Sequence, residues 1–262
     1  MRLLIASFLL SIFFSGCTEF NPVTQRQDLI LYSTEREVSI GKNVARQVEK
    51  EYKLLKNPLV IDRVDKIAEK IAAVCDRRDV AYYVRVVQAK EREKELGADI
   101  NAFALPGGYV YVFESLLEFV DSDDQLAAVI AHEIAHIVAK HSIKKLQASM
   151  GATLLTLATL ATEDPNFVSG TNYALTNLML AYSRQDELLA DRLSIQYTRE
   201  AGYDPRAMID FLEKLREKHK KDPLRRRSVY RTHPYTAERI AEIKQQLGEP
   251  LTIADYVNRA NE

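Results

Sequence analysis

The stretch VIAHEIAHIVAKH runs from Val129 to His141, and the fold and function expected of the chain follow from it. Its first two histidines, His132 and His136, stand four residues apart, and Glu133 follows the first of them. Residues four apart project from the same face of an α-helix, so both imidazoles can bind one metal ion. The HExxH spacing is typical of zinc sites in which the glutamate takes a proton from the zinc-bound water. We therefore expect a metal-binding helix with Glu133 as its catalytic base.

The alternative is an ordinary helix with a pair of histidines on its solvated face. Ile130, Ile134 and Ile137 argue against it, because they make this a buried helix. A buried helix does not accept two histidines and a glutamate without partners. His141 comes nine residues after His132, which places it on the opposite face. We expect His141 to be structural, with a hydrogen bond near the helix end.

A third ligand is expected from the segment Tyr182–Asp191, where Glu187 and Asp191 are again four residues apart. One carboxylate completes a His₂Glu site and leaves the fourth position open. A second carboxylate can accept the N–H of a ligand histidine and fix its tautomer. Taken alone, this spacing is common on solvated helices; in a chain that also carries HExxH it favours Glu187 as ligand and Asp191 as its supporting neighbour. Asp186 is the rival ligand, but it has no carboxylate four residues on.

The composition is that of an ordinary globular protein. The chain has 262 residues, of which 47% are hydrophobic and 28% charged, with a net charge of -1. This length can bury a substantial core as one large domain or two small ones. A nearly neutral chain has no general attraction to nucleic acid, and we expect no nucleic-acid partner.

The N-terminus has the features of a secretory signal. An apolar run from Leu3 to Phe14 is too short to span a bilayer, and Ser15 and Gly16 precede Cys17. Small residues before a cysteine resemble a lipoprotein signal, although a leucine is more usual than a phenylalanine at position 14. We expect residues 1–16 to be a signal peptide. Cleavage elsewhere and an uncleaved anchor are the alternatives.

If this is correct, Cys17 carries lipid and residues 17–33 form a polar tether. Thr18, in place of an aspartate, favours the outer membrane by resemblance to Gram-negative lipoprotein sorting. The other cysteine, Cys75, then has no disulfide partner and is expected to be buried.

Hydrophobic spacing and capping signals predict an α+β domain over residues 34–262, mostly helical, with a small sheet before the HExxH helix. Helices are expected from Thr34 through Leu55, from Pro58, from Ser122, over 146–161, from Ser183 to Gly202, from Pro205, and over 236–247. Thr34 with Glu37 and Ser122 with Gln125 are the expected caps. A strand is expected over 80–87. A hairpin is expected over 101–113 around Pro106-Gly107-Gly108, where glycine supplies the positive φ of a tight turn.

These motifs together resemble one family. HEIAH followed by SRxxExxAD, here Ser183–Asp191, is similar to the HtpX and CAAX-prenyl-protease-like gluzincin peptidases. Asn101–Gly108 resembles the family's edge-strand hairpin, and Thr232-His233-Pro234 with Arg239 resembles its late histidine motif. The resemblance covers roughly residues 35–247. Without multiple long transmembrane segments, the chain is most similar to the lipid-anchored envelope branch of BepA, LoiP and YcaL type, without BepA's C-terminal repeat domain.

The resemblance implies roles for further residues. Asn101, Ala102, Phe103 and Ala104 would form a cleft-edge strand to which an extended substrate backbone adds. His233 would face the metal, either to stabilise the oxyanion or to occupy the open zinc position as a latch. The plainer alternatives are an ordinary hairpin and a loop histidine. One Zn²⁺ per chain is expected, bound by His132, His136 and Glu187.

The leading hypothesis is a zinc endopeptidase, an outer-membrane lipoprotein facing the periplasm, that cuts misfolded or unassembled envelope proteins. A chaperone-like binder of unfolded envelope proteins, with little or latched proteolysis, is the alternative, and a hydrolase of non-peptide substrates is a third class. The intact Glu133 argues against a pure binder, which has no need of that carboxylate. The expected edge strand argues against a non-peptide substrate.

Overall fold

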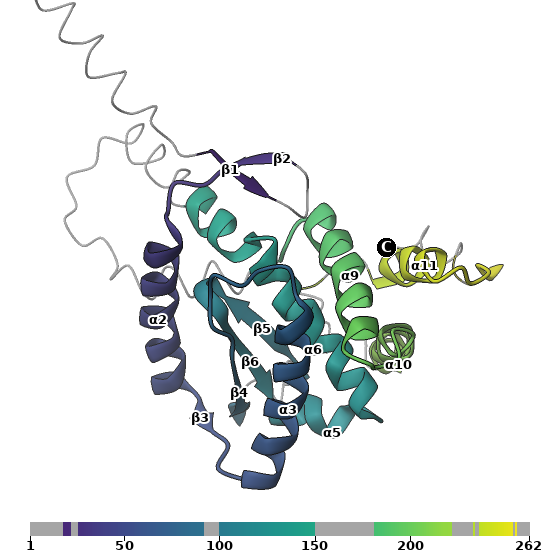
Figure 1. Cartoon of the computed structure of the whole chain (residues 1–262). Coiled ribbons are helices and arrows are strands. Elements are labelled where there is room, and N and C mark those ends of the chain that lie inside the picture. Colours follow the sequence, from purple (N-terminus) through teal and green to yellow (C-terminus); the bar gives the residue numbers. More distant parts are fainter. Residues whose placement is uncertain are drawn as a thin grey trace, which may run out of the picture.

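A computed structural model gives the fold of the chain (Figure 1). It describes residues 18–21, 26–91, 100–149, 181–221, 233, 236–253 and 255. The expected signal peptide (1–16), the expected lipidation site Cys17, and Thr232 and Pro234 of the late histidine motif lie outside the described residues. The helix expected over 146–161 is described only as far as residue 149.

The predicted α+β class is confirmed, with a small sheet ahead of the helix that carries the histidines. The helical elements are α2 (Thr34–Glu51), α3 (Pro58–Val74), η1 (Pro106–Gly108), α5 (Glu114–Phe119), α6 (Asp123–Val138), α9 (Arg184–Glu200), α10 (Ala207–Lys221) and α11 (Thr236–Gln246). The strands are β1 (Thr18–Asn21), β2 (Arg26–Leu29), β3 (Lys53–Leu54), β4 (Tyr83–Gln88), β5 (Ala102–Leu105) and β6 (Tyr109–Phe113).

The main sheet has the strand order β3-β4-β6-β5. β4 and β6 are parallel, whereas β3 and β5 run antiparallel to their neighbours. The predicted β5–β6 hairpin is confirmed, and its turn is η1, where Gly107 and Gly108 have φ of 74° and 103°. β5 therefore lies at one edge of the sheet as the structure describes it.

Alternate residues of the sheet face two separate cores, as the two-residue period of a strand requires. Ala102 and Ala104 belong to the larger core, which α3, α6, α9 and α10 share. Phe103 and Leu105 face the smaller core under α2. Figure 1 shows this layering, with α2 on one side of the sheet and α3 and α6 on the other. Both faces of β5 are therefore buried.

Several predicted helix ends are confirmed. Asn57 accepts the N–H of Leu59 at the start of α3, with Pro58 in the first turn. Ser122 Oγ accepts the N–H of Gln125 at the start of α6. Gly202, after α9, has a φ of 83°, the left-handed conformation that ends many helices.

The predicted Thr34–Glu37 capping box is wrong. Ser33 is the N-cap of α2, and its Oγ accepts the N–H of Arg36. The Glu37 carboxylate is instead buried and accepts two hydrogen bonds from the Arg77 guanidinium, at 3.0 and 2.8 Å. The charge-assisted hydrogen bonds with Arg77, which is distant in the sequence, therefore engage the Glu37 carboxylate that the capping box would need.

Other predicted boundaries also shift. The first helix does not reach Leu55 but ends at Glu51, because the following residues pair with β4, and the N–H of Leu55 bonds to the carbonyl of Val86 at 2.9 Å. The strand expected from Val80 begins at Tyr83, and the helix expected from Pro205 begins at Ala207. The short helix α5 was not predicted.

Within the expected tether, β1 and β2 pair as an antiparallel ribbon. No helix in the described ranges is long and apolar enough to cross a membrane.

Candidate metal centre

Helix α6 carries His132, Glu133 and His136 into the interior of the protein. The helix is buried from Gln125 to its end, and these three residues are 3%, 2% and 0% exposed. Its apolar positions pack on the sheet and on α3, as the run of isoleucines and alanines predicts. The three polar side chains must therefore find their partners inside the protein.

Helix α9 supplies the carboxylates. A capping box fixes its start, because Ser183 Oγ accepts the N–H of Asp186 while the Asp186 carboxylate accepts the N–H of Ser183. α9 packs along α6 (Figure 1) and turns Glu187 and Asp191 toward it. Both carboxylates are buried, 0% and 1% exposed.

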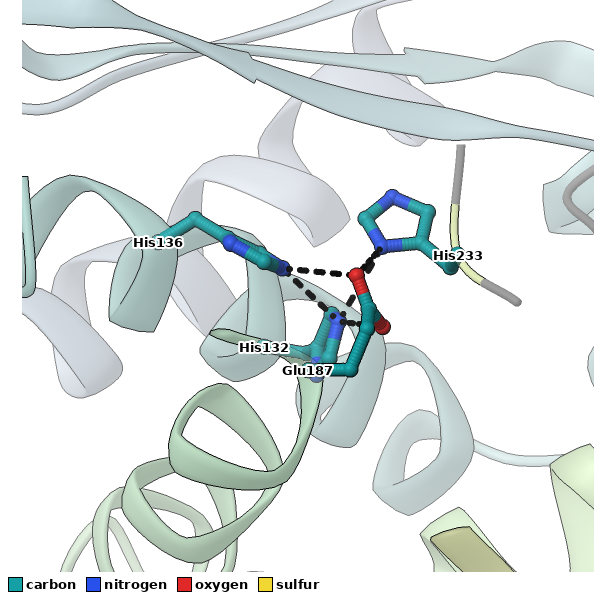
Figure 2. A group of neighbouring side chains, drawn as sticks. All are labelled: His132, His136, Glu187 and His233. Atoms are coloured by element: carbon teal, nitrogen blue, oxygen red, sulfur yellow. Dashed lines mark hydrogen bonds and ion pairs between the residues drawn. The ribbon is translucent and has the colours of Figure 1, made fainter. Parts of the chain in front are cut away.

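Four side chains converge at the point where the two helices meet (Figure 2). One ligand atom from each of His132, His136, Glu187 and His233 lies within 4.8 Å of all the others. His132 Nε2 lies 3.1 Å from His136 Nε2 and 3.5 Å from Glu187 Oε2. His136 Nε2 lies 3.6 Å from Glu187 Oε1. In a tetrahedral zinc site, ligand atoms lie roughly 3.3 Å apart, so the donor set and its spacing fit zinc.

His233, in contrast, arrives from far along the sequence. Its Nδ1 lies 2.9 Å from Glu187 Oε1 and 3.3 Å from His132 Nε2. Its Nε2 lies 3.3 Å from Glu133 Oε1. The ring therefore stands between the three other metal-binding side chains and the glutamate of the HExxH motif.

Asp191 and Arg239 support this group from behind. His132 Nδ1 lies 2.9 Å from Asp191 Oδ1, so the second nitrogen of the ring is held by a carboxylate. Arg239 donates to both oxygens of Asp191 at 2.7 Å, and its Nη1 lies 3.0 Å from Glu187 Oε2. The sequence analysis assigned Arg239 to the late histidine motif. It did not predict that this arginine is buried and is the counter-ion of both Asp191 and Glu187.

Two further contacts hold the His136 ring, and sequence reasoning missed both. Tyr182 stacks on it, with ring centroids 3.9 Å apart and planes 20° apart. His136 Nδ1 lies 2.9 Å from Nδ1 of His141, which was expected to be structural and to hydrogen-bond near the helix end, but not to contact His136. A signal for Tyr182 was present, because it immediately precedes the capping box of α9.

The protonation states in the metal-free chain follow from these contacts. Burial and Arg239 each lower the pKa of His132, but hydrogen bonds to Asp191 and Glu187 outweigh them and raise that pKa to about 9. Burial and the neighbouring His132 hold the pKa of His136 well below its usual value. Burial alone would raise the pKa of Glu187, yet His233 and Arg239 hold it well below the usual value. Glu187 is thus a carboxylate and His136 neutral, the forms in which they bind metal.

A small pocket adjoins the centre on the side of Glu133. It is lined by His132, Glu133, His233 and Arg239 together with Ala102, Leu116, Val129, Met208, Phe211 and Leu212. Glu133 Oε2 is buried there with no hydrogen-bond partner among the described residues. Burial of a carboxylate oxygen without a hydrogen-bond partner is costly, and this oxygen can accept a hydrogen bond or a proton from a molecule in the pocket.

The residues expected to form the substrate strand lie beside this pocket. Ala102, Phe103 and Ala104 belong to β5, and Asn101 immediately precedes it, with its carbonyl accepting the N–H of Phe113. All four residues are at most 6% exposed.

A helix with two histidines and a glutamate, packed against a second helix with the third ligand, defines the class as HExxH metallopeptidases. The match to the model of peptidase family M48 spans residues 58–247, and the chain belongs to that family. The centre is a metal-binding site typical of the zinc peptidases of this family.

Individual relatives are distant. The chain is 26% identical over 228 residues to the beta-barrel assembly-enhancing protease of Escherichia coli strain K12, covering 83% of this chain and 45% of that protein. It is 29% identical over 238 residues to the mitochondrial metalloendopeptidase OMA1 of Schizosaccharomyces pombe, covering 88% and 67%. Over 116 residues it is 38% identical to OMA1 of Arabidopsis thaliana, covering 44% and 24%. The chain thus spans about half the length of the bacterial relative.

Proposed function

We propose that this protein is a zinc endopeptidase, anchored by lipid in the bacterial envelope, that cuts unfolded or misassembled envelope proteins. One observation carries the catalytic part of the proposal. Glu133, buried and with one oxygen without a hydrogen-bond partner among the described residues, adjoins a buried cluster of three histidines and a glutamate. Such a carboxylate is costly to bury, and general-base catalysis gives it a purpose.

Different residues of the chain would bind the metal, orient its ligands and transfer the proton. His132, His136 and Glu187 would hold one zinc ion, and Asp191 orients the His132 ring. Zinc, when bound, supplies a Lewis acid that polarises a carbonyl and makes water acidic near neutral pH. Glu133 then takes a proton from the attacking water and delivers it to the leaving amine, so that the peptide bond breaks with no covalent enzyme intermediate.

His233 is best understood as a latch. Its Nδ1 joins the metal-binding group while its Nε2 lies 3.3 Å from Glu133. The attacking water must occupy the space between the metal and that carboxylate, and the imidazole fills it. We therefore propose a closed form that becomes active when His233 withdraws.

Peptide binding at β5 would also require the closed form to open. β5 ends the described sheet, and Ala102 lines the pocket beside His132 and Glu133. An extended peptide that pairs with this strand would bring its backbone to Glu133. Because the strand is at most 4% exposed, its edge must first be uncovered. Backbone pairing makes few demands on sequence, which suits an enzyme that acts on unfolded chains.

The proposal for the envelope and its substrates is supported by the N-terminal sequence and by the name of one set of relatives, the beta-barrel assembly-enhancing proteases. Replacing Cys17 with serine is expected to abolish labelling by radioactive fatty acid and to release the protein from membranes. Continued labelling would contradict lipidation at Cys17.

The peptidase is tested by elemental analysis of the purified chain, run beside casein hydrolysis with and without a chelator. We expect one zinc per chain and cleavage that stops with the chelator and returns with zinc. Glu133→Gln should keep zinc and lose at least about 100-fold in rate. Glu118→Gln, at an exposed position of α5, is the matched control. Cleavage by Glu133→Gln at the wild-type rate would refute the mechanism.

The position of His233 also favours a second candidate, a binder of unfolded envelope proteins whose proteolysis is latched. Zinc with no cleavage in wild type or in His233→Ala, together with tight binding of unfolded casein, would support it over the peptidase.

A further inference from the structure

The chain makes a short turn after the metal-binding helix. α6 ends at Val138, and Lys140 has a φ of 58°, the left-handed conformation that residues other than glycine seldom adopt. A new helical stretch begins at 141. The turn brings His141, 3% exposed, back against His136 instead of leaving it on the far face of the helix. A left-handed residue ends many helices, and here it also places His141 against the metal-binding helix.

The contact between the two histidines has a defined direction. His136 offers Nε2 to the metal-binding group, so that nitrogen must be deprotonated and Nδ1 carries the ring proton. Nδ1 of His136 therefore donates, and Nδ1 of His141, at 2.9 Å, must accept. The proton of His141 is then on Nε2, which lies 3.3 Å from Asp186 Oδ1.

Asp186 is itself fixed in position. Its other oxygen, Oδ2, accepts from Ser183 Oγ at 2.6 Å and from the Ser183 N–H at 3.2 Å, within the capping box of α9. The next residue is Glu187. The chain of contacts His136–His141–Asp186 thus runs from a ligand on α6 to the first turn of the helix that carries the third ligand.

We infer that His141 and Asp186 are positioning residues of the metal centre. They fix the tautomer and the edge of the His136 ring, whose face Tyr182 holds, and they keep α6 and α9 at the separation that zinc binding needs. The inference rests on the metal site of the proposed function. In it, His141 holds Nδ1 of His136 as Asp191 holds Nδ1 of His132. Loss of such an outer partner typically weakens metal binding by about 10 to 100-fold.

The test measures zinc dissociation constants of the full-length protein by competition with a chromophoric chelator. His141→Phe, which keeps a ring but cannot accept the hydrogen bond from His136, is expected to weaken zinc binding by about 10 to 100-fold. Asp186→Asn keeps an oxygen for the Ser183 cap, and with a side chain 36% exposed it should fold. It is expected to weaken zinc binding by a smaller factor.

Three further measurements separate positioning from general destabilisation. Asn57→Ala removes the cap of α3, which carries none of the metal-binding residues, so it should lower the melting temperature without changing zinc affinity. The variant with both His141→Phe and Asp186→Asn should bind zinc no more weakly than His141→Phe alone, because the two residues act in one chain. The visible spectrum of the cobalt-substituted protein should change in His141→Phe and not in Asn57→Ala.

Zinc affinities within twofold of wild type for both His141→Phe and Asp186→Asn, with an unchanged cobalt spectrum, would overturn the inference. Additive losses in the double variant would overturn it as well. Failure of the peptidase itself would look different: wild type would bind zinc, the variants would lose it as expected, and casein would stay intact. A wild-type chain without zinc would refute both.

Discussion

Arg239 donates to both carboxylate oxygens of Asp191, at 2.7 Å each, and all of these atoms are buried. The pair joins α11 to α9 directly behind the metal-binding group. Without Arg239, the buried carboxylate of Asp191 would be an uncompensated negative charge beside Glu187, and burying an unpaired charge costs a large free energy. Arg239 therefore makes it possible for two carboxylates to stand in the interior one helical turn apart.

We expect Arg239→Gln to weaken zinc binding by about 10 to 100-fold, because Asp191 would lose the partner that aims it at His132. Chelator competition on the folded protein measures this. Removal of one member of a buried ion pair also costs roughly 3–5 kcal/mol of stability, so folding must be monitored alongside. Arg192→Gln, at an exposed position of α9, should leave both quantities unchanged. Wild-type zinc affinity in a folded Arg239→Gln protein would contradict this role.

His233→Ala is expected to raise the rate of casein hydrolysis. The imidazole stands between the metal-binding group and Glu133, so its removal opens the place of the attacking water. Initial rates at saturating zinc measure the effect, since loss of one ligand also weakens metal binding. A lower rate would instead assign His233 to oxyanion stabilisation, the other role that its position permits.

Zinc affinity should fall as the pH is lowered. The pKa of His132 in the metal-free chain is raised to about 9, so below that pH zinc must displace its proton, whereas His136 is already neutral. The apparent dissociation constant is therefore expected to rise about tenfold for each pH unit below 9, with release of about one proton from His132 per zinc. Competition titrations between pH 6 and 8.5 measure the slope. Affinity independent of pH in this range would contradict the protonation of His132.

The sequence predicted those residues of the site whose positions depend only on spacing along one helix. His132, Glu133 and His136 on one element, and Glu187 with Asp191 on another, follow from a period of 3.6 residues and from the donor types that zinc prefers. His141 did not follow, because the argument from helical angle assumes that the helix continues. The left-handed Lys140 ends it, and nothing local in the sequence requires that conformation.

The errors in the fold have the same origin. Glu37 fits a local capping box, but the buried Arg77 takes its carboxylate. Leu55 fits the helical period, yet its N–H bonds to the strand residue Val86. In each case a contact between residues far apart in sequence competes with a local preference and prevails. Periodicity predicted the existence of the elements, whereas tertiary contacts decided their ends.

Helix α2 packs closely against the turn before β6. A Cβ atom on Gly41 would lie 1.9 Å from the carbonyl oxygen of Pro106, and backbone cannot move aside as a side chain can. Gly41→Ala should therefore push η1 away and lower the free energy of unfolding by roughly 1–3 kcal/mol, measured by chemical denaturation. Lys42→Ala, exposed on the same helix, should have little effect.

Because η1 joins β5 to β6, displacement of this turn should also disturb the strand proposed to pair with substrate. We expect Gly41→Ala to raise KM for casein while zinc affinity stays at the wild-type value, since His132, His136 and Glu187 lie on other elements. Kinetics at saturating zinc and chelator competition separate the two quantities. A variant destabilised as expected but with an unchanged KM would show that the position of η1 does not govern substrate binding, and would count against peptide pairing at β5.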